Sequence, residues 1–325
     1  MKATAIAPSN IAFIKYWGKT DEELRLPSNG SLSMNLSNLL TTTTVEFDSR
    51  LLHDDVLVNN QRDVLKEKRV AEHLDRIRTR ANISYKAKVV SQNNFPSSTG
   101  LSSSASAFAA LTVAGSSASG LSLPEKELTV LARLGSGSAS RSIPDGFVQW
   151  KADSRSEESY AYSLFPESHW DIADVVVILS EKEKDVPTSV GQTYTRKNHF
   201  FHTRLKHIDE KLSLCKTYIQ EKNFPLFGEL IEQEALELHA IMMTTTPYLL
   251  YLFPETVSLI KIIRKWRDGG LPVYFTLNTG QNMHLICEKI NVKKLVSELK
   301  KIKEVKEIIV NYPTIGTRLA DKHLF

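Results

Sequence analysis

Apolar and polar residues alternate along the chain in patterns that predict strands and helices in both halves. A two-residue period over 83–90 predicts a half-buried strand, because successive side chains of a strand point to opposite faces. A nearly continuous apolar run over 173–179 predicts a strand buried on both faces. Apolar residues spaced by three and four predict helices over 198–220 and 254–268. Strands and helices mix without a dominant βαβ repeat, so the pattern predicts an α+β fold.

The remaining segments show the same mixture of predicted helices and strands. Further helices are predicted over 63–81, 124–134, 225–243 and 292–302. Further strands are predicted over 41–47, 146–150, 273–277, 283–287 and 305–310, with a hairpin at 57–63. Residues 151–172 are polar and turn-rich, and 180–191 reads as a charged loop. A boundary just before the buried strand would give two domains, 1–172 and 173–325.

The stretch 95–111 joins a polar loop to the start of a helix of small residues. Unpaired N–H groups and the positive dipole end of a helix N-terminus favour an anion there. Gly100 would let the backbone approach a ligand closely. Hydroxyls for phosphate oxygens or a metal ion come from Ser102, Ser103, Ser104 and Ser106. The preceding strand favours a phosphate cradle, and an ordinary serine-capped helix is the alternative.

Two other clusters carry polar chemistry. The run GSGSASRS at 135–142 includes Arg141, which fits a site that holds more than one anionic group, although a flexible linker has the same composition. Near the N-terminus, Lys15 and Lys19 flank Tyr16 and Trp17. These lysines form either a cationic wall for phosphate or carboxylate, or a strand end with snorkelling side chains.

Composition narrows the class of protein. The chain has 325 residues, 42% hydrophobic and 24% charged, with a net charge of +4, as expected of a soluble globular protein. This charge requires no nucleic-acid partner and suits a polyanionic small substrate. The lysines at 293–306 lie on an amphipathic pattern, which predicts a solvated helix face. Cys215 and Cys287 form no CxxC motif, and no apolar run approaches a membrane span, so we expect a cytoplasmic protein with no membrane partner.

Taken together, these loops resemble the GHMP kinase superfamily and, within it, the ATP-dependent mevalonate diphosphate decarboxylases. Five blocks in order carry the resemblance: NIAFIKYWGK at 10–19, LPSNGSLSMNL at 26–36, PSSTGLSSSASAFAAL at 96–111, GSGSASRS with GFVQW at 135–150, and HAIMMTTTPYLLYLFPET at 239–256. IKYWGK and GSGSASRS are specific to the decarboxylase branch, whereas the central serine loop marks the wider superfamily. The resemblance covers most of the chain.

The resemblance implies a GHMP kinase fold with a ribosomal-protein-S5-domain-2-like N-terminal domain and a ferredoxin-like C-terminal α/β sandwich domain. It implies ATP and Mg²⁺ as cofactors, a phosphorylated mevalonate as substrate, and a homodimer. The family phosphorylates the tertiary 3-hydroxyl of 5-diphosphomevalonate, which then loses phosphate and CO₂ to give isopentenyl diphosphate.

The resemblance also implies roles for individual residues. Catalysis is implied for Lys15, Arg141 and Asn278. Substrate binding is implied for Tyr16, Lys19, Ser136, Ser138, Arg141 and Thr188. Binding of the ATP phosphates is implied for Gly100, Leu101, Ser102, Ser103, Ser104, Ala105 and Ser106, with Ser104 as the Mg²⁺ ligand. His239 is expected to be a hydrogen-bonded interface residue outside the site.

One segment departs from the family pattern. Asn278, within VYFTLNTGQN at 273–282, stands where the family has its catalytic aspartate, and Thr279 and Gln281 replace an alanine and a proline. An amide neither accepts a proton at neutral pH nor carries charge. Three hypotheses follow: a slower decarboxylase, a mevalonate (phosphate) 3-kinase or phosphomevalonate decarboxylase, or a low-activity ATP-binding relative. The first is favoured because Lys15 and Arg141 remain, and a pure kinase has little need for Arg141.

Overall fold

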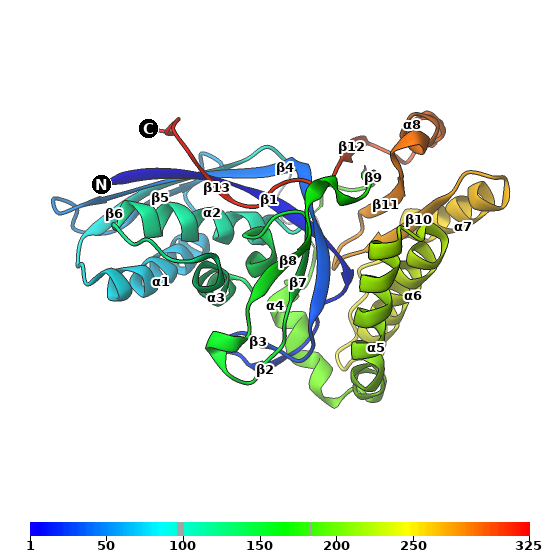
Figure 1. Cartoon of the computed structure of the whole chain (residues 1–325), viewed down its shortest axis with the longest axis horizontal. Coiled ribbons are helices and arrows are strands. Elements are labelled where there is room, and N and C mark those ends of the chain that lie inside the picture. Colours follow the sequence, from blue (N-terminus) through cyan, green and yellow to red (C-terminus); the bar gives the residue numbers. More distant parts are fainter. Residues whose placement is uncertain (96–100, 183) are drawn as a thin grey trace.

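The computed structural model describes residues 1–95, 101–182 and 184–325, which form two antiparallel-rich sheets with helices packed against them (Figure 1). The N-terminal sheet has the strand order β13-β1-β4-β6-β5, with β7 and β8 extending from β4. The C-terminal sheet has the order β10-β11-β9-β12. This mixture of sheets and helices is the α+β fold that the hydrophobic pattern predicts.

The N-terminal sheet is built on two long antiparallel strands, β1 (Lys2–Ile14) and β4 (Ser31–Asp48). The threonine-rich half of β4 favours a strand because β-branched side chains fit the pleated surface. The other strands are β5 (Asp55–Val58), β6 (Lys86–Asn93), β7 (Phe147–Trp150), β8 (Ala161–Phe165) and β13 (Arg318–Ala320). One face of the sheet packs against α1 (Val64–Ala81), α2 (Ser103–Ala118) and α3 (Glu125–Gly135). A small hairpin, β2 (Lys19–Asp21) with β3 (Leu26–Pro27), lies between β1 and β4 in sequence.

The C-terminal sheet is centred on β9 (Ile172–Ile178), every residue of which is buried, as its continuous apolar run predicts. Its neighbours are β10 (Val273–Leu277), β11 (Met283–Glu288) and β12 (Glu307–Asn311). One face of β9 packs with α7 (Pro254–Asp268) and α8 (Val292–Leu299). The other face joins a core with α5 (His199–Glu221) and α6 (Phe224–Met243).

The two halves share buried contacts. One hydrophobic cluster includes Ile11 of β1, Leu36 of β4, Val176 of β9 and Phe227 of α6. The chain also returns at its end, because β13 pairs antiparallel with β1, and both termini lie at the same side of the molecule in Figure 1. The end of β1 is therefore held between the N-terminal sheet and the helices of the C-terminal half.

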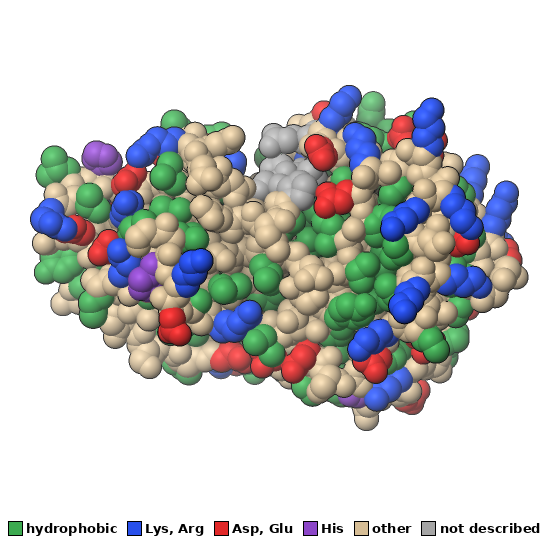
Figure 2. All heavy atoms as spheres, turned by 90° about the horizontal axis from the view of Figure 1, so that it is seen from above, with side chains coloured by type: hydrophobic (Ala, Val, Ile, Leu, Met, Phe, Trp, Pro, Cys, Tyr) green, Lys and Arg blue, Asp and Glu red, His purple; other side chains and the backbone are tan. Residues whose placement is uncertain are grey.

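The lysines of α8 lie on a solvated helix face, as predicted. Val292, Leu295 and Leu299 are buried, whereas Lys293 and Lys294 are exposed. Figure 2 shows lysine and arginine side chains spread among acidic and neutral ones over the right-hand half of the molecule. In the described ranges, no helix is long and apolar enough to cross a membrane.

Four local predictions are incomplete or wrong. Val58 and Gln61 form an antiparallel bridge, as the predicted hairpin requires, but it does not extend into two paired strands, because β5 pairs in parallel with β6. Within 151–172, β8 forms because its backbone pairs with β7. The run 135–142 is mostly the 3₁₀ helix η1 (Gly137–Ser142), whose small buried residues pack closely against the helices around it, and it is neither a loop nor a linker. The loop 180–191 carries the short helix α4 (Thr188–Gly191).

Candidate functional site

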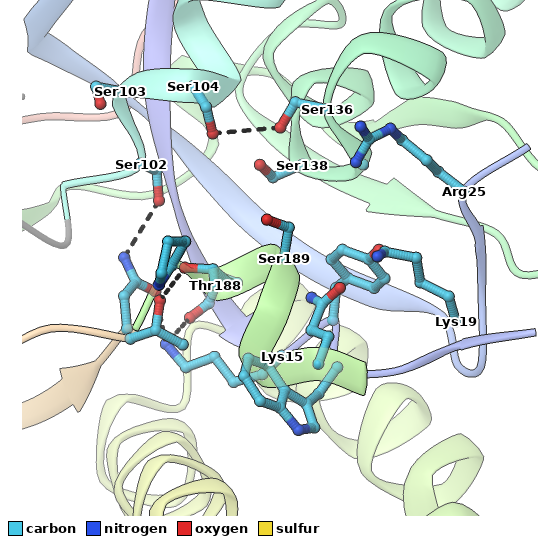
Figure 3. A pocket seen from close by; sticks show the side chains of 18 of the residues that line it. Lys15, Lys19, Arg25, Ser102, Ser103, Ser104, Ser136, Ser138, Thr188 and Ser189 are labelled. Atoms are coloured by element: carbon cyan, nitrogen blue, oxygen red, sulfur yellow. Dashed lines mark hydrogen bonds between the residues drawn. The ribbon is translucent and has the colours of Figure 1, made fainter. Parts of the chain in front are cut away.

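A cavity of about 280 Å³, called the pocket below, lies where the end of β1 meets α2, η1, α4 and the residues after β10. In Figure 3, the hydroxyls of Ser102, Ser103 and Ser104 lie at one end, and Lys19 and Arg25 lie at the other. The pocket brings together residues that are far apart in the sequence. Of the predicted site residues, those that line it are Lys15, Tyr16, Lys19, Ser102, Ser103, Ser104, Ser136, Ser138, Arg141, Thr188 and Asn278.

The serine-rich segment forms one wall. Ser102 is the N-cap residue of α2, but it has a left-handed backbone (φ 56°) and its side chain does not cap the helix. A simple serine-capped helix therefore does not describe this segment, since a capping hydroxyl would accept an N–H of the first turn. Ser104 Oγ lies 3.3 Å from Ser136 Oγ of the loop before η1, so hydroxyls from two segments meet here.

The remaining predicted cofactor residues lie elsewhere or outside the described ranges. Leu101 packs in the hydrophobic core, and Ala105 is buried and does not line the pocket. Ser106 Oγ lies 2.6 Å from Thr41 Oγ1 of β4, so this hydroxyl is engaged within the fold. Gly100 lies outside the described residues. A ligand can still meet the backbone of this segment, but the side chains of Leu101, Ala105 and Ser106 are not offered to it.

The charge of the pocket wall is entirely positive among the described residues. The charged side chains that line it are Lys15, Lys19, Arg25, Arg69, Arg141 and Lys184. Lys19 is almost buried, and its Nζ lies 2.6 Å from Glu22 Oε2, which belongs to the hairpin outside the wall. A concave surface lined by cations and hydroxyls concentrates a multiply charged anion.

Lys15 lies at the end of β1 and is 3% exposed. Its Nζ donates to the Ala12 carbonyl oxygen at 2.6 Å and to Asn278 Oδ1 at 3.4 Å. Burial lowers the pKa of Lys15 to about 7, partly offset by the carboxylate of Glu234, and the charge of Arg141 lowers it further. Lys15 therefore changes charge near neutral pH.

Arg141 extends from η1 into the pocket. Nη1 donates to Ser31 Oγ at 2.6 Å and Nη2 donates to Asn10 Oδ1 at 3.2 Å, and no carboxylate in the described ranges forms an ion pair with it. Burial lowers its pKa to about 10, so it remains a cation at neutral pH. Tyr16 packs against Trp150 nearby, and a Cβ at Gly137 would lie 2.8 Å from the Tyr16 ring. Glycine at that position lets η1 approach the ring closely.

Asn278 follows β10 and connects two parts of the wall. Its Oδ1 accepts from Lys15, and its Nδ2 lies 3.3 Å from Ser102 Oγ. His239 of α6 does not line the pocket; its Nε2 lies 3.1 Å from the Asn278 carbonyl oxygen, which agrees with the predicted hydrogen-bonded interface residue. The amide thus lies between the lysine and the serine segment.

Sequence reasoning missed several cations of the wall. Lys184 lay in the segment read as a charged loop, yet its Nζ donates to Thr188 Oγ1 at 2.6 Å and to the Thr279 carbonyl oxygen at 3.2 Å. Burial lowers the pKa of Lys184 to about 8. Arg25 comes from the β2–β3 hairpin and Arg69 from α1. Each belongs to an ordinary surface pattern, so only the folded arrangement reveals that they face one cavity.

Comparisons with known proteins agree along the whole chain. The sequence model of the diphosphomevalonate decarboxylase-like N-terminal domain matches residues 7–161, and that of the mevalonate 5-diphosphate decarboxylase C-terminal domain matches 174–319. The diphosphomevalonate decarboxylase of Debaryomyces hansenii is 34% identical, over 92% of this chain and 82% of its own. The chain belongs to the diphosphomevalonate decarboxylase family.

Solved structures of this family superpose closely on the chain. The crystal structure of mevalonate diphosphate decarboxylase from Staphylococcus aureus matches with a TM-score of 0.94 at 36% identity, covering 98% of both chains. A structure of MDDEF in complex with MVAPP, AMPPCP and magnesium matches with a TM-score of 0.92 at 37% identity, covering 99% of both chains. The α+β architecture is that of the GHMP kinase fold, as the resemblance implies.

Proposed function

We propose that the chain catalyses the ATP-dependent decarboxylation of 5-diphosphomevalonate to isopentenyl diphosphate, ADP, phosphate and CO₂. The observation that carries this proposal is a pocket whose charged lining is wholly cationic and includes Arg141, which has no acidic partner in the described ranges. Such a wall suits a substrate that carries a diphosphate and a carboxylate together with ATP. The MDDEF structure with MVAPP, AMPPCP and magnesium supports the same assignment.

The residues at the start of α2 fit the phosphates of ATP. Ser102 leaves the first turn without a side-chain cap, and the Ser103 and Ser104 hydroxyls line the pocket. No group of three or more His, Cys, Asp or Glu residues that could hold a metal is found in the described ranges. This donor set fits Mg²⁺ held through substrate phosphates with one hydroxyl, for which we propose Ser104. The bound ion would neutralise phosphate charge during transfer.

We assign the substrate groups by charge and shape. The Arg141 guanidinium matches a carboxylate in two parallel hydrogen bonds and holds it in one plane, with Ser136 and Ser138 beside it. Tyr16 and Lys19 are assigned to the diphosphate, together with Thr188 on α4. Holding the carboxylate and the 3-phosphate in one geometry promotes decarboxylation, because the electron pair of the bond to CO₂ forms the new double bond as phosphate leaves.

Lys15 and Asn278 are assigned to the phosphoryl transfer step. A protonated Lys15 stabilises negative charge on the transferring group. Asn278 positions Lys15 through its Oδ1 but does not take the proton of the 3-hydroxyl, because an amide is not basic at neutral pH. Phosphoryl transfer depends largely on positioning and charge stabilisation, so turnover without a carboxylate base is slower rather than absent.

A single incubation tests the proposed function. The protein is mixed with ATP, Mg²⁺ and 5-diphosphomevalonate, and ADP and CO₂ are measured in the same tube. Equal release of both products is the expected result. ADP without CO₂ would indicate a 3-kinase and contradict the proposal, as would the absence of both products. Repeating the incubation with mevalonate and its 5-phosphate distinguishes the phosphorylation state of the substrate.

We also propose an ATP-binding domain over 1–172 and a second domain over 173–325. β8 of the N-terminal sheet ends at Phe165 and β9 of the C-terminal sheet begins at Ile172, one residue before this boundary, while β13 returns to the N-terminal sheet. A homodimer in the cytoplasm is proposed as well. Both cysteines are buried and free, which suits a reducing compartment. Light scattering after size-exclusion chromatography tests the dimer, since a mass near that of one 36.6 kDa chain would contradict it.

A further inference from the structure

The main chain of Lys15 is held from behind the pocket on both its donor and its acceptor side. Its N–H donates to Glu234 Oε1 at 3.0 Å. Its carbonyl oxygen accepts from Arg204 Nη2 at 3.0 Å and from Asn29 Nδ2 at 2.9 Å. Arg204 and Glu234 also form an ion pair with each other. One lysine of the wall is therefore fixed by a closed ring of contacts.

This ion pair reaches Lys15 from two helices of the C-terminal half. Arg204 lies on α5 and Glu234 on α6, and the side chains of both are fully buried. Lys211 Nζ lies 3.1 Å from Glu234 Oε2, so both carboxylate oxygens are engaged. Neither Arg204 nor Glu234 lines the pocket. Among the described residues that line the pocket, Lys15 is the one that hydrogen-bonds to the pair.

A buried ion pair is a weak source of stability, because desolvating two charges offsets most of their attraction. Its contacts with both the N–H and the carbonyl oxygen of one residue instead suggest a role in position. We propose that the Arg204–Glu234 pair is a positioning device for Lys15, which fixes its main chain from behind the pocket and balances the charge around its ammonium group. This inference rests on the proposed catalytic role of Lys15.

The charges around Lys15 predict the direction in which each variant should shift the pKa of this lysine. The charged and titratable groups that face it, from the elements packed around it, are Glu234 and His239 on α6, Arg204 on α5, Arg141 on η1 and Asp174 on β9. Burial lowers the pKa of His239 to about 4, so it is neutral where Lys15 titrates. Glu234 raises the pKa of Lys15, whereas Arg204 lowers it. Removing the Glu234 carboxylate should therefore lower the pKa of Lys15, and removing the Arg204 guanidinium should raise it.

The experiment compares Glu234→Gln with Arg204→Gln in the full chain. Lys15 is labelled with cyanate over a pH series, and the labelled peptide is quantified by mass spectrometry. Relative to the unaltered protein, the labelling midpoint should fall by about one pH unit in Glu234→Gln and rise by about one pH unit in Arg204→Gln. With 5-diphosphomevalonate as substrate, the pH limb of kcat should move in the same two directions while KM for ATP stays unchanged.

The control is a second glutamate–arginine pair, whose glutamate lies on the same helix as Glu234. Glu232 of α6 pairs with Arg267 of α7 at 2.8 Å and does not contact Lys15. Glu232→Gln and Arg267→Gln should leave the labelling midpoint of Lys15 unchanged. A structural role alone would move the midpoint in the same direction in both members of the Arg204–Glu234 pair, or in neither, and either result would overturn the inference.

Folding of each variant is checked by a cooperative thermal transition. If Glu234→Gln does not fold, the double glutamine variant replaces it, and its midpoint must lie below that of Arg204→Gln. The labelling also separates this inference from the proposed function. Opposite shifts in a protein that releases no CO₂ would preserve the positioning role and refute decarboxylation. An unshifted labelling midpoint in a protein that releases CO₂ would refute the positioning role and leave the decarboxylase assignment standing.

Discussion

Two buried arginines lie close enough to Lys15 to lower its pKa, and they differ in their partners. Arg204, behind the pocket, is paired with the carboxylate of Glu234. Arg141, on the pocket wall, donates to the neutral oxygens of Ser31 and Asn10 and lies over the Trp150 ring, and no carboxylate in the described part of the chain pairs with it. Burying a guanidinium without a counter-charge is costly. The difference indicates that the charge of Arg204 is compensated within the protein, whereas the charge of Arg141 is left available for an anionic ligand.

The largest effect, on stability, should come from removing the carboxylate that pairs with Arg204. Glu234→Ala leaves Arg204 buried without a full counter-charge, and we expect it to lower the free energy of unfolding by about 3–5 kcal/mol. Arg141→Ala removes a charge that has no acidic partner, so its loss of stability should be much smaller. Chemical denaturation followed by circular dichroism measures both values. Equal losses in the two variants would contradict the distinction between the arginines.

The next largest effect, on catalysis, should come from removing Arg141, the arginine without an acidic partner. Arg141→Ala should reduce CO₂ release by roughly 10²–10³-fold, the usual consequence of removing a preorganised donor from a charged group of the substrate. ATP binding, measured by calorimetry, should remain nearly intact, because the serine segment is unchanged. Arg133 offers a matched control: it is buried and bonded to Ser159 and Ser156, outside the pocket. Arg133→Ala should reduce stability without reducing CO₂ release per folded molecule, whereas loss of ATP binding in Arg141→Ala would refute its placement.

The sequence indicated a site role for Arg141 but gave no sign of the Arg204–Glu234 pair. Arg141 stands in GSGSASRS, a local motif of small residues, so its place in the pocket could be expected. Arg204 and Glu234 lie at ordinary positions of two amphipathic helices, and nothing in either helix indicates a buried ion pair. The contact between them depends on how α5 and α6 pack against the end of β1, which a one-dimensional pattern does not specify.

Elements of the fold were predictable where their burial leaves a local pattern in the sequence. Continuous or periodic apolar runs predicted β9, α7 and β10 closely, because burial determines their sequences directly. β8 and β13 are held by backbone pairing with β7 and β1, and short strands of this kind leave little hydrophobic signal. The same limit applies to Lys184, which reaches the pocket from a charged segment.

The smallest expected effect comes from placing a carboxylate on the pocket side of Lys15. Asn278 Oδ1 lies 3.4 Å from Lys15 Nζ, so Asn278→Asp would give the ammonium group a counter-charge on the wall as well as behind it. If a base for the 3-hydroxyl is missing, kcat should rise by about tenfold or more, within the usual contribution of general base catalysis. Asn278→Ala, which removes the amide without adding charge, should give no gain. An unchanged kcat in Asn278→Asp would contradict the expectation that a carboxylate at this position acts as the base.

The pH dependence of the same variant separates charge from base catalysis. Lys15 has a pKa of about 7, so activity that requires its ammonium form should fall as the pH rises through 7 in the unaltered protein. A carboxylate at position 278 favours the charged lysine and should move this limb upward by about 1–3 pH units. A gain in kcat below pH 6, where Lys15 is already protonated, would then reflect the base. A gain confined to pH values above 7 would instead reflect retention of the lysine charge, and Asn278 would be a position that tunes Lys15 rather than one that has lost a base.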